Sequence, residues 1–200
     1  MSNVVQRLPY VDASSITDPA MRAEFERAAR EGAPRPESHA IRAHVPEVFW
    51  AFANAWNDTF VNGVCDHSLK ELCRLYVSQA VNCNYCGNQR SLKAQAQGLV
   101  EDDVRDLLEF EKSSRFDARQ KAALRLAEAM TWGLDSTDEL WAGLRAHLQV
   151  PQIVELGFFI GLTMGQQRWN RLLNLQHGSF MGGLAGGLAP AEAARQEGRH

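Results

Sequence analysis

The chain has 200 residues and a formal net charge of −3, with 21 Lys and Arg against 24 Asp and Glu. This length suits one domain that buries its own hydrophobic core. The two signs of charge are mixed along the chain, which excludes the basic stripe typical of nucleic-acid-binding proteins and of proteins that bind anionic membranes. We therefore expect no nucleic-acid partner and no membrane partner.

The N-terminus lacks the basic start and apolar block of a secretory signal. The longest apolar stretch, residues 153–164, is interrupted by Glu155 and is shorter than the roughly 20 residues needed to cross a bilayer. These features predict a cytoplasmic protein. Cytoplasmic cysteines are mostly reduced, so a close pair among the four cysteines indicates catalysis or metal binding rather than a structural disulfide.

The first half of the chain reads as a series of helices. Apolar spacing predicts one over about 18–30 and another from about Pro46 to before Gly63. Residues 68–71 form a capping box, which predicts a helix that begins at Leu69. Asn82 is the expected N-cap of the next helix, with Cys83 in its first turn and its end at Gly98.

The second half continues in the same way. We expect helices over 101–112, after Asp117, after a second capping box at 136–139, and from Pro151 to about Gln176. No stretch shows the period-two alternation of strands. The prediction is an all-α, single-domain fold of about eight helices over residues 1–177, with its core at about 40–177, followed by a flexible Gly/Ala-rich tail over 178–200.

The sequence Cys83-Asn84-Tyr85-Cys86 is the main candidate for chemistry. Two cysteines three residues apart on a helix are neighbours on its surface and can form a disulfide without large strain. In the first helical turn, Cys83 would lie near unpaired N–H groups, which favour the nucleophilic thiolate. The pair therefore predicts thiol–disulfide chemistry.

Two other interpretations of this pair stay open. Cys65 and His67 could complete a Cys₃His zinc site with Cys83 and Cys86, although no second CxxC is present. Alternatively, the cysteines are buried and inert, an interpretation that suits Cys65 and Cys73 best.

Three short segments resemble the carboxymuconolactone decarboxylase superfamily, and its alkylhydroperoxidase D branch in particular. They are Lys70-Glu71-Leu72, the Cys83–Cys86 motif and Gly98-Leu99, with a weaker likeness at 153–156. The resemblance is specific across about 68–107. It implies an all-helical fold that assembles as a homo-oligomer, such as a trimer, a hexamer or a dimer.

The same resemblance implies roles for individual residues. Cys86 would be oxidised by a hydroperoxide to a sulfenic acid, Cys83 would resolve it as a disulfide, and Glu71 would belong to a proton relay. The helix-end argument instead makes Cys83 the thiol of lower pKa, so the order of attack stays open. Glu71 is also the last residue of the capping box, and the two roles are compatible.

Arg90 stands where the family's typical motif has a histidine, four residues after the second cysteine. On a continuous helix its side chain would point back at Cys86 and stabilise a thiolate there. A guanidinium stays protonated, so it cannot pass a proton as imidazole does. The alternative is a solvated arginine, and His67, the nearest histidine in sequence, is expected in a solvated loop.

The last long helix carries three further features. Gly157, Gly161 and Gly165 form a smooth stripe that predicts close packing in the core or between subunits. Glu155 is expected to be hydrogen-bonded inside the structure, because a lone buried carboxylate is costly. The polar cluster 166–171 is either an exposed helix end or a subunit contact.

Together these features predict an enzyme, a peroxiredoxin-type thiol peroxidase or disulfide oxidoreductase, with Cys83, Cys86, Glu71 and Arg90 as its catalytic residues. Its partners would be a hydroperoxide or disulfide substrate and a thiol reductant. No nucleotide, flavin or haem motif is present, so no cofactor and no metal are expected. A carboxymuconolactone decarboxylase-type lyase and a non-catalytic or zinc-binding oligomeric module are the alternatives.

Overall fold

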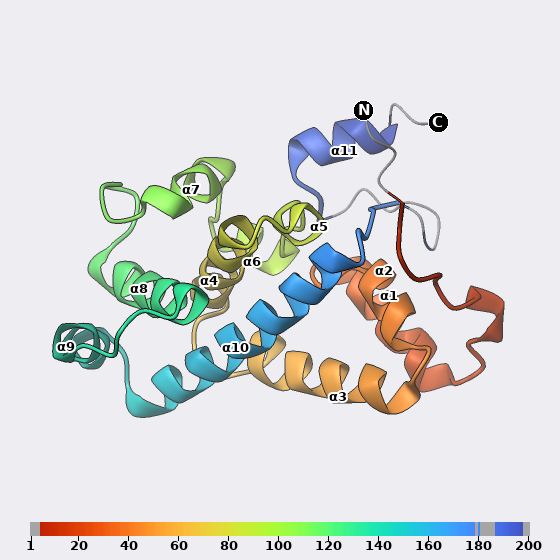
Figure 1. Ribbon diagram of the computed structural model, residues 1–200, viewed down its shortest axis with the longest axis horizontal. Helices are drawn as coiled ribbons and strands as arrows, with labels where there is room; N and C mark the ends of the chain where they lie inside the picture. The colour runs from red at the N-terminus through yellow and green to blue at the C-terminus, as the bar shows by residue number, and fades with distance from the viewer. Residues whose placement is uncertain (1–4, 179, 181–186, 198–200) are drawn as a thin grey trace.

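The computed structural model describes residues 5–178, 180 and 187–197. The elements in these residues are all helical, and Figure 1 shows their arrangement. The α-helices are α1 (Pro19–Glu31), α2 (Pro36–Arg42), α3 (Pro46–Trp56), α4 (His67–Ala80), α5 (Asn84–Gly87), α6 (Leu92–Ala96), α7 (Glu101–Asp106), α8 (Ala118–Trp132), α9 (Asp138–His147), α10 (Val150–Leu172) and α11 (Pro190–Glu197). Three short elements join them: the 3₁₀ helices η1 (Ala13–Ser15) and η3 (Leu107–Glu109) and the π-helical turn η2 (Asn57–Val61).

The predicted all-α fold is confirmed. Within the described ranges no strand occurs, and Gln89 and Leu188 form only an isolated antiparallel bridge. The eleven α-helices exceed the eight expected for three reasons: α2 lies in a predicted loop, α5 and α6 replace one longer helix, and α11 lies in the predicted tail.

The core is built around α4 and α10, which cross in the middle of the molecule (Figure 1). Helix α8 packs against both of them, α9 packs against α8, and α3 runs below α10 in this view. Leu75 of α4, Leu124 of α8 and Leu156 of α10 are all fully buried in one apolar cluster. Burying each such side chain contributes about 1.5–3 kcal/mol, so this crossing anchors the rest of the chain.

The two predicted capping boxes at 68–71 and 136–139 are wrong. Helix α4 begins at His67 with Asp66 as its N-cap, and Glu71 points into the protein rather than back to Ser68. Helix α9 is capped one residue later than predicted, by the Thr137 hydroxyl, which accepts from the Leu140 N–H. The cap at Asp117 is as predicted, with a reciprocal bond to Gln120.

Glu155 has the internal hydrogen bonds expected for a buried carboxylate. It accepts from the Lys70 ammonium at 2.9 Å and from the Cys65 N–H at 3.0 Å, and also from the Val64 N–H. Lys70 is 1% exposed and also donates to the Thr59 carbonyl. This pair therefore ties α4 to α10 and to the loop between η2 and α4.

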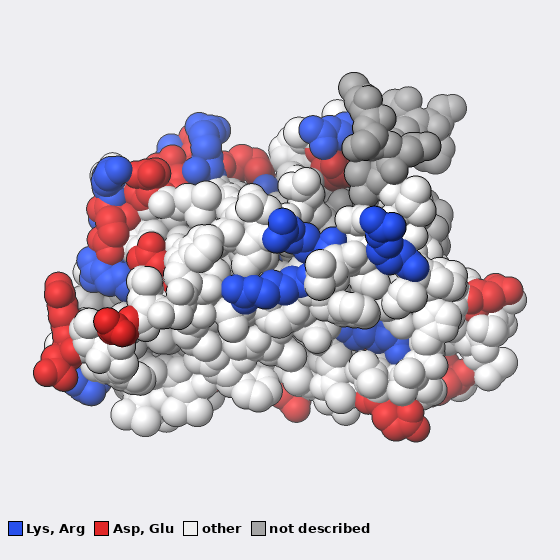
Figure 2. Space-filling view, viewed as in Figure 1, with Lys and Arg blue, Asp and Glu red and all other residues white. Residues whose placement is uncertain are grey.

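The glycine stripe of α10 does not pack inside the described chain. A Cβ added at Gly157 or Gly165 would meet no atom within 4 Å, and at Gly161 it would meet only the Met130 Cε, at 3.7 Å. Val154 and Phe158 on the same helix are more than half exposed. Figure 2 shows few charged side chains along the lower edge of this face. Close packing in the core is thus wrong, and the homo-oligomer stays a prediction.

The described part of the segment 178–200 is packed against the domain. The Arg90 N–H donates to the Gly187 carbonyl at 2.8 Å, and the Ala189 N–H donates to the Asn88 carbonyl at 2.8 Å. Gly32 and Gly187, both with positive φ, touch backbone to backbone, and a Cβ at Gly32 would lie 2.7 Å from the Gly187 Cα. This differs from the loose tail that we expected, and residues 179, 181–186 and 198–200 lie outside the described residues.

No single helix in the described ranges is long and apolar enough to cross a membrane. Taken together, helices α9 and α10 have the length and apolar composition of a membrane span, but they meet at a bend of 117°.

The Lys70–Glu155 pair makes a stability prediction. Replacing Glu155 by Ala leaves the buried Lys70 ammonium without its counter-charge, so we expect a loss of about 3–5 kcal/mol in the free energy of unfolding. Urea denaturation measures this loss. The double variant Lys70→Met, Glu155→Met removes both charges and should recover most of it; equal destabilisation in both variants would contradict the assignment.

Candidate functional site

The cysteine motif begins directly after a sharp turn at the end of α4 and continues through the single-turn helix α5. Asn82 has a φ of 54°, in the left-handed region, and Cys83 is the N-cap of the single-turn helix α5. The Cys86 N–H donates to the Cys83 Sγ at 3.3 Å. Asn82 is therefore not the N-cap, and the predicted continuous helix to Gly98 is wrong, because the helix ends at Gly87 and a new one begins only at Leu92.

A disulfide joins Cys83 and Cys86, whose Cα atoms are 5.3 Å apart. The two residues are only 1% and 3% exposed. The sequence prediction that this pair can bridge is confirmed.

The two sulfur-bearing residues border different spaces. Cys83 lines an open depression of about 400 Å³, together with Asn84, Gly87 and Arg90. Cys86 lines a small cavity of about 20 Å³ on the other side, and the amide of Asn170 lies 3.7 Å from its Sγ. A molecule bound in the open depression would thus lie beside Cys83, and a small molecule bound in the cavity would lie beside Cys86.

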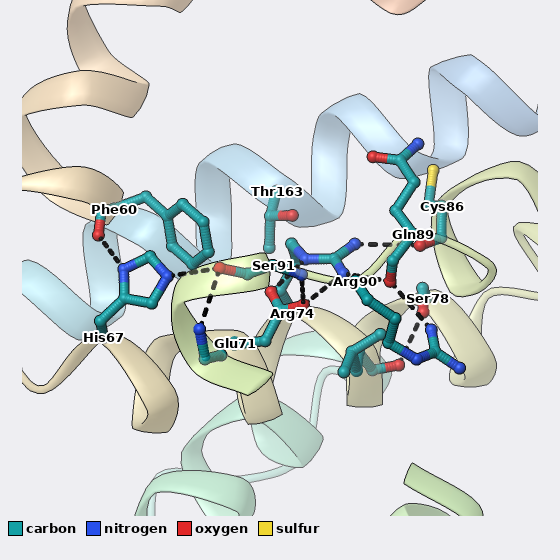
Figure 3. Close-up of polar contacts among 12 residues, drawn as sticks. Phe60, His67, Glu71, Arg74, Ser78, Cys86, Gln89, Arg90, Ser91 and Thr163 are labelled. Carbon is teal, nitrogen blue, oxygen red and sulfur yellow. Dashed lines mark hydrogen bonds and ion pairs between the residues drawn. The ribbon is translucent and has the colours of Figure 1, made fainter. Parts of the chain in front are cut away.

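Arg90 does not point at Cys86, because no helix connects the two. Its guanidinium donates twice to Glu101, at 2.7 and 2.9 Å, and to the carbonyls of Gly87 and Gln89. In the view of Figure 3 the Arg90 guanidinium and the Cys86 sulfur extend in opposite directions. The expectation that Arg90 stabilises a thiolate at Cys86 is therefore wrong. Arg90 borders the depression beside Cys83 instead.

Glu71 is fully buried and held by Arg74, one turn further along α4. The Arg74 guanidinium donates to the two carboxylate oxygens at 2.6 and 2.8 Å, and the Ser91 N–H donates to the same carboxylate at 2.9 Å. Arg74 also donates to the carbonyls of Cys86 and Gln89, both at 2.9 Å (Figure 3). Glu71 therefore reaches the cysteine motif through Arg74 and its backbone contacts.

His67 is buried, not solvated as we expected. Its Nδ1 lies 2.9 Å from the Phe60 carbonyl and its Nε2 lies 2.7 Å from the Ser91 hydroxyl (Figure 3). Burial lowers the pKa of His67. Since Ser91 also donates to Glu71, the structure links His67, Ser91, Glu71 and Arg74 in one polar network.

The zinc site that we considered is not assembled. Nowhere in the described ranges do three His, Cys, Asp or Glu side chains gather as metal ligands, and His67 is engaged by Phe60 and Ser91. Cys65 and Cys73 are buried free thiols, and burial raises the pKa of both. They fit the inert role predicted for them.

Arg74, Ser91, Gln167 and Asn170 lie near the motif, and the sequence did not predict this. Gln167 and Asn170 are buried, so the polar cluster 166–171 is not simply an exposed helix end. The spacing of Glu71 and Arg74, three apart on a predicted helix, was the one available signal for their pairing. Gln167 and Asn170 on α10 are 81 and 84 positions from Cys86, and only folding brings them to the motif.

Tyr85, between the two cysteines, anchors the motif to the N-terminal helices. Its hydroxyl accepts from the Ser38 N–H at 3.1 Å and lies 3.3 Å from Glu37, and its ring stacks on His177 at 4.4 Å. Burial raises the pKa of Tyr85 well above its usual value. The His177 Nε2 lies 2.8 Å from the Tyr85 carbonyl and donates to it, while burial lowers the pKa of this ring to about 3 and so favours its neutral form.

The Glu71–Arg74 pair predicts a large effect on stability. In Glu71→Ala the buried Arg74 loses its counter-charge, and we expect a loss of about 3–5 kcal/mol in the free energy of unfolding of the oxidised protein. Urea denaturation measures it, with the exposed Glu26→Ala as the matched control. An unchanged unfolding midpoint would show that Glu71 does not hold the motif in place.

His177 predicts a pH effect. Burial lowers its pKa to about 3, against about 6.5 in the unfolded chain. The unfolded state then binds more protons below pH 6.5, so this contribution to stability is complete above that pH and falls by up to about 1.4 kcal/mol per pH unit below it. His177→Gln should flatten the fall of the urea midpoint between pH 7 and 5. The same slope in both proteins would contradict a buried neutral ring.

Residues 46–129 match the model of the carboxymuconolactone decarboxylase family. A protein of Bacillus subtilis (strain 168), the uncharacterized protein YdfG, is 28% identical over 109 residues, which are 54% of this chain and 72% of YdfG.

Among solved structures, the debrominase Bmp8 in its apo form has a TM-score of 0.71 at 18% identity, over 98% of this chain and 97% of Bmp8. A cysteine-to-alanine variant of Bmp8 in complex with 2,3,4-tribromopyrrole has a TM-score of 0.70 at 18% identity, over 100% and 99%. An Agrobacterium tumefaciens protein of unknown function, suggested to be the antioxidant defence protein AhpD, has a TM-score of 0.55 at 23% identity, over 66% and 89%. At these identities the likeness shows a shared fold.

The family match covers α3 to most of α8, and so includes the cysteine motif, Glu71 and Arg90. Residues 46–129 therefore match the carboxymuconolactone decarboxylase family, the same family that the sequence motifs resemble.

Proposed function

We propose that this protein is a thiol-dependent oxidoreductase whose Cys83–Cys86 pair cycles between dithiol and disulfide, with a hydroperoxide as the oxidant. The observation that carries the proposal is the disulfide itself, formed in a turn where each cysteine borders a different space. The match to the carboxymuconolactone decarboxylase family supports an enzymatic role in general.

The reaction begins at Cys86. Its thiolate attacks the hydroperoxide, forming an S–O bond and breaking the O–O bond, and the departing alkoxide takes up a proton to become an alcohol. The Cys83 thiol then attacks the sulfenic sulfur of Cys86, and water leaves as the disulfide forms. A dithiol reductant returns the two electrons by attacking Cys83 from the open depression, which regenerates both thiols.

The surroundings of each sulfur support this order. The Asn170 amide lies 3.7 Å from the Cys86 Sγ and is placed to donate to a thiolate, which lowers a thiol pKa. The Cys83 side opens on the larger depression, where a reductant has room. Arg90 and Glu71 do not contact the Cys86 sulfur, so in this proposal Glu71 acts with Arg74 as a positioning residue.

The likeness to Bmp8 favours a second candidate, reductive dehalogenation. It extends over nearly the whole of both chains, and the Cys86 cavity is bordered by the aromatic rings of Phe52 and Trp56. In this reaction the two thiols supply two electrons, a C–H bond replaces a C–Br bond, bromide leaves, and the disulfide forms. A lyase, by contrast, needs no cysteine pair.

The test is consumption of cumene hydroperoxide and of hydrogen peroxide with dithiothreitol as reductant. Cys86→Ser removes the nucleophile, so we expect the rate to fall by at least about 10²-fold. Cys65→Ser, a buried free thiol outside the motif, is the matched control and should keep the wild-type rate.

Other outcomes discriminate among the candidates. An unchanged rate in Cys86→Ser would refute the peroxidase. Debromination of 2,3,4-tribromopyrrole that requires Cys86, without peroxide consumption, would establish the dehalogenase. Turnover of a muconolactone by the double variant Cys83→Ser, Cys86→Ser would establish the lyase.

A further inference from the structure

The small cavity on the Cys86 side is lined mainly by residues of α2, α3, α4, α5 and α10. The side chains that matter for its chemistry are Arg42, Phe52, Trp56, Cys86, Gln167 and Asn170. Of all the residues that line it, Cys86 alone acquires a negative charge, when its disulfide is reduced.

Three buried polar atoms of this lining lack a hydrogen-bond partner among the described residues. They are the Arg42 Nη1, the Trp56 Nε1 and the Gln167 Oε1, on side chains that are 6%, 3% and 3% exposed. An unsatisfied buried polar atom costs about 1–3 kcal/mol. Two of these atoms, on Arg42 and Trp56, are donors, and the third, on Gln167, is an acceptor. Together, beside Cys86, they point to a ligand with two acceptor positions and one donor.

Among the described residues, the Arg42 guanidinium also lacks a negatively charged partner. Its Nη2 and Nε donate to the neutral Gln166 amide at 2.8 and 3.2 Å, and its guanidinium lies 3.5 Å from the centre of the Phe52 ring. No carboxylate in the described part of the chain forms an ion pair with it, and burial lowers the pKa of Arg42 to about 9. A buried cation of this kind favours a nearby anion.

We propose that Arg42, Trp56 and Gln167 form a subsite that holds the –O–O–H group of a small hydroperoxide against Cys86. The subsite deepens the proposed function and rests on it. The two donors bind the peroxide oxygens, and the Gln167 oxygen accepts the O–H. When the Cys86 thiolate attacks and the O–O bond breaks, Arg42 stabilises the oxyanion that leaves, and that oxyanion then takes up a proton from water.

The size of the cavity limits the substrate. Its volume of about 20 Å³ is close to the 10–15 Å³ that one water molecule needs. Hydrogen peroxide adds one oxygen atom to a water molecule, whereas a bulky alkyl group requires displacement of the lining. The subsite therefore favours hydrogen peroxide over cumene hydroperoxide.

The experiment compares kcat/KM for hydrogen peroxide and cumene hydroperoxide in Arg42→Met, Arg42→Lys and Trp56→Phe. Arg168→Met is the matched control, because Arg168 lies beside Gln167 on α10, donates to the Thr131 carbonyl and does not line the cavity. Reduction of the Cys83–Cys86 disulfide by dithiothreitol is measured in parallel, since it reports on an intact motif without using the subsite.

We expect Arg42→Met to lower kcat/KM for hydrogen peroxide by about 10²-fold, as for loss of one oxyanion-binding donor, with disulfide reduction and Arg168→Met unchanged. Arg42→Lys keeps the cation and should recover part of the loss. Trp56→Phe keeps the ring and loses one N–H, so it should cause a smaller decrease. The wild-type protein should prefer hydrogen peroxide to cumene hydroperoxide by about 10-fold or more.

Three results would overturn the inference. If Arg42→Met and Trp56→Phe keep the wild-type kcat/KM while Cys86→Ser is inactive, the peroxidase stands and the cavity holds a structural water only. If cumene hydroperoxide reacts as fast as hydrogen peroxide, the size limit is wrong. If the wild-type protein consumes neither peroxide although dithiothreitol reduces its disulfide, the proposed function fails, and the subsite fails with it.

Discussion

The buried Arg74 guanidinium is the contact on which the geometry of the site depends. The chain stops being helical between α5 and α6, and Arg74 donates to the carbonyls of Cys86 and Gln89 on this stretch, both at 2.9 Å. Glu71 neutralises this guanidinium and also accepts the Ser91 N–H at the start of α6. The Glu71–Arg74 ion pair therefore holds the backbone both before and after Arg90. In this way it fixes the direction in which each cysteine faces.

That turn separates two environments around a single disulfide. Cys83 borders an open depression next to the Arg90–Glu101 pair, whereas Cys86 borders a much smaller cavity next to Arg42, which has no carboxylate partner among the described residues. The dithiol–disulfide cycle that we propose would use both, with a hydroperoxide on the Cys86 side and a thiol reductant on the Cys83 side. Helix α10 supplies part of the Cys86 side through Gln167 and Asn170, and the Lys70–Glu155 pair links that helix to α4.

The same fold carries different reactions in different proteins, so the fold alone does not identify the chemistry. This chain matches the carboxymuconolactone decarboxylase family at 46–129 and shares its overall fold with a debrominase. The chemistry of this chain depends on the side chains around the turn that carries Cys83 and Cys86. An arginine at position 90 faces Glu101, and the imidazole nearest to Glu71, His67, is reached through Ser91. In the reaction that we propose, the leaving oxygen would therefore take its proton from solvent.

The sequence by itself determined the helical class, the cysteine pair and the presence of Glu71, because apolar periodicity and a local CxxC spacing are short-range properties. It could not predict that the helix breaks after Gly87, because the broken segment is held partly by Arg74, which donates to the carbonyls of Cys86 and Gln89 from another helix. It also could not place Arg42 and Gln167 beside Cys86, since these residues are 44 and 81 positions away and meet only through the packing of α2 and α10. Tertiary structure alone decided which way Arg90 and His67 face, because burial and long-range hydrogen bonds outweigh the local preference of a polar side chain for solvent.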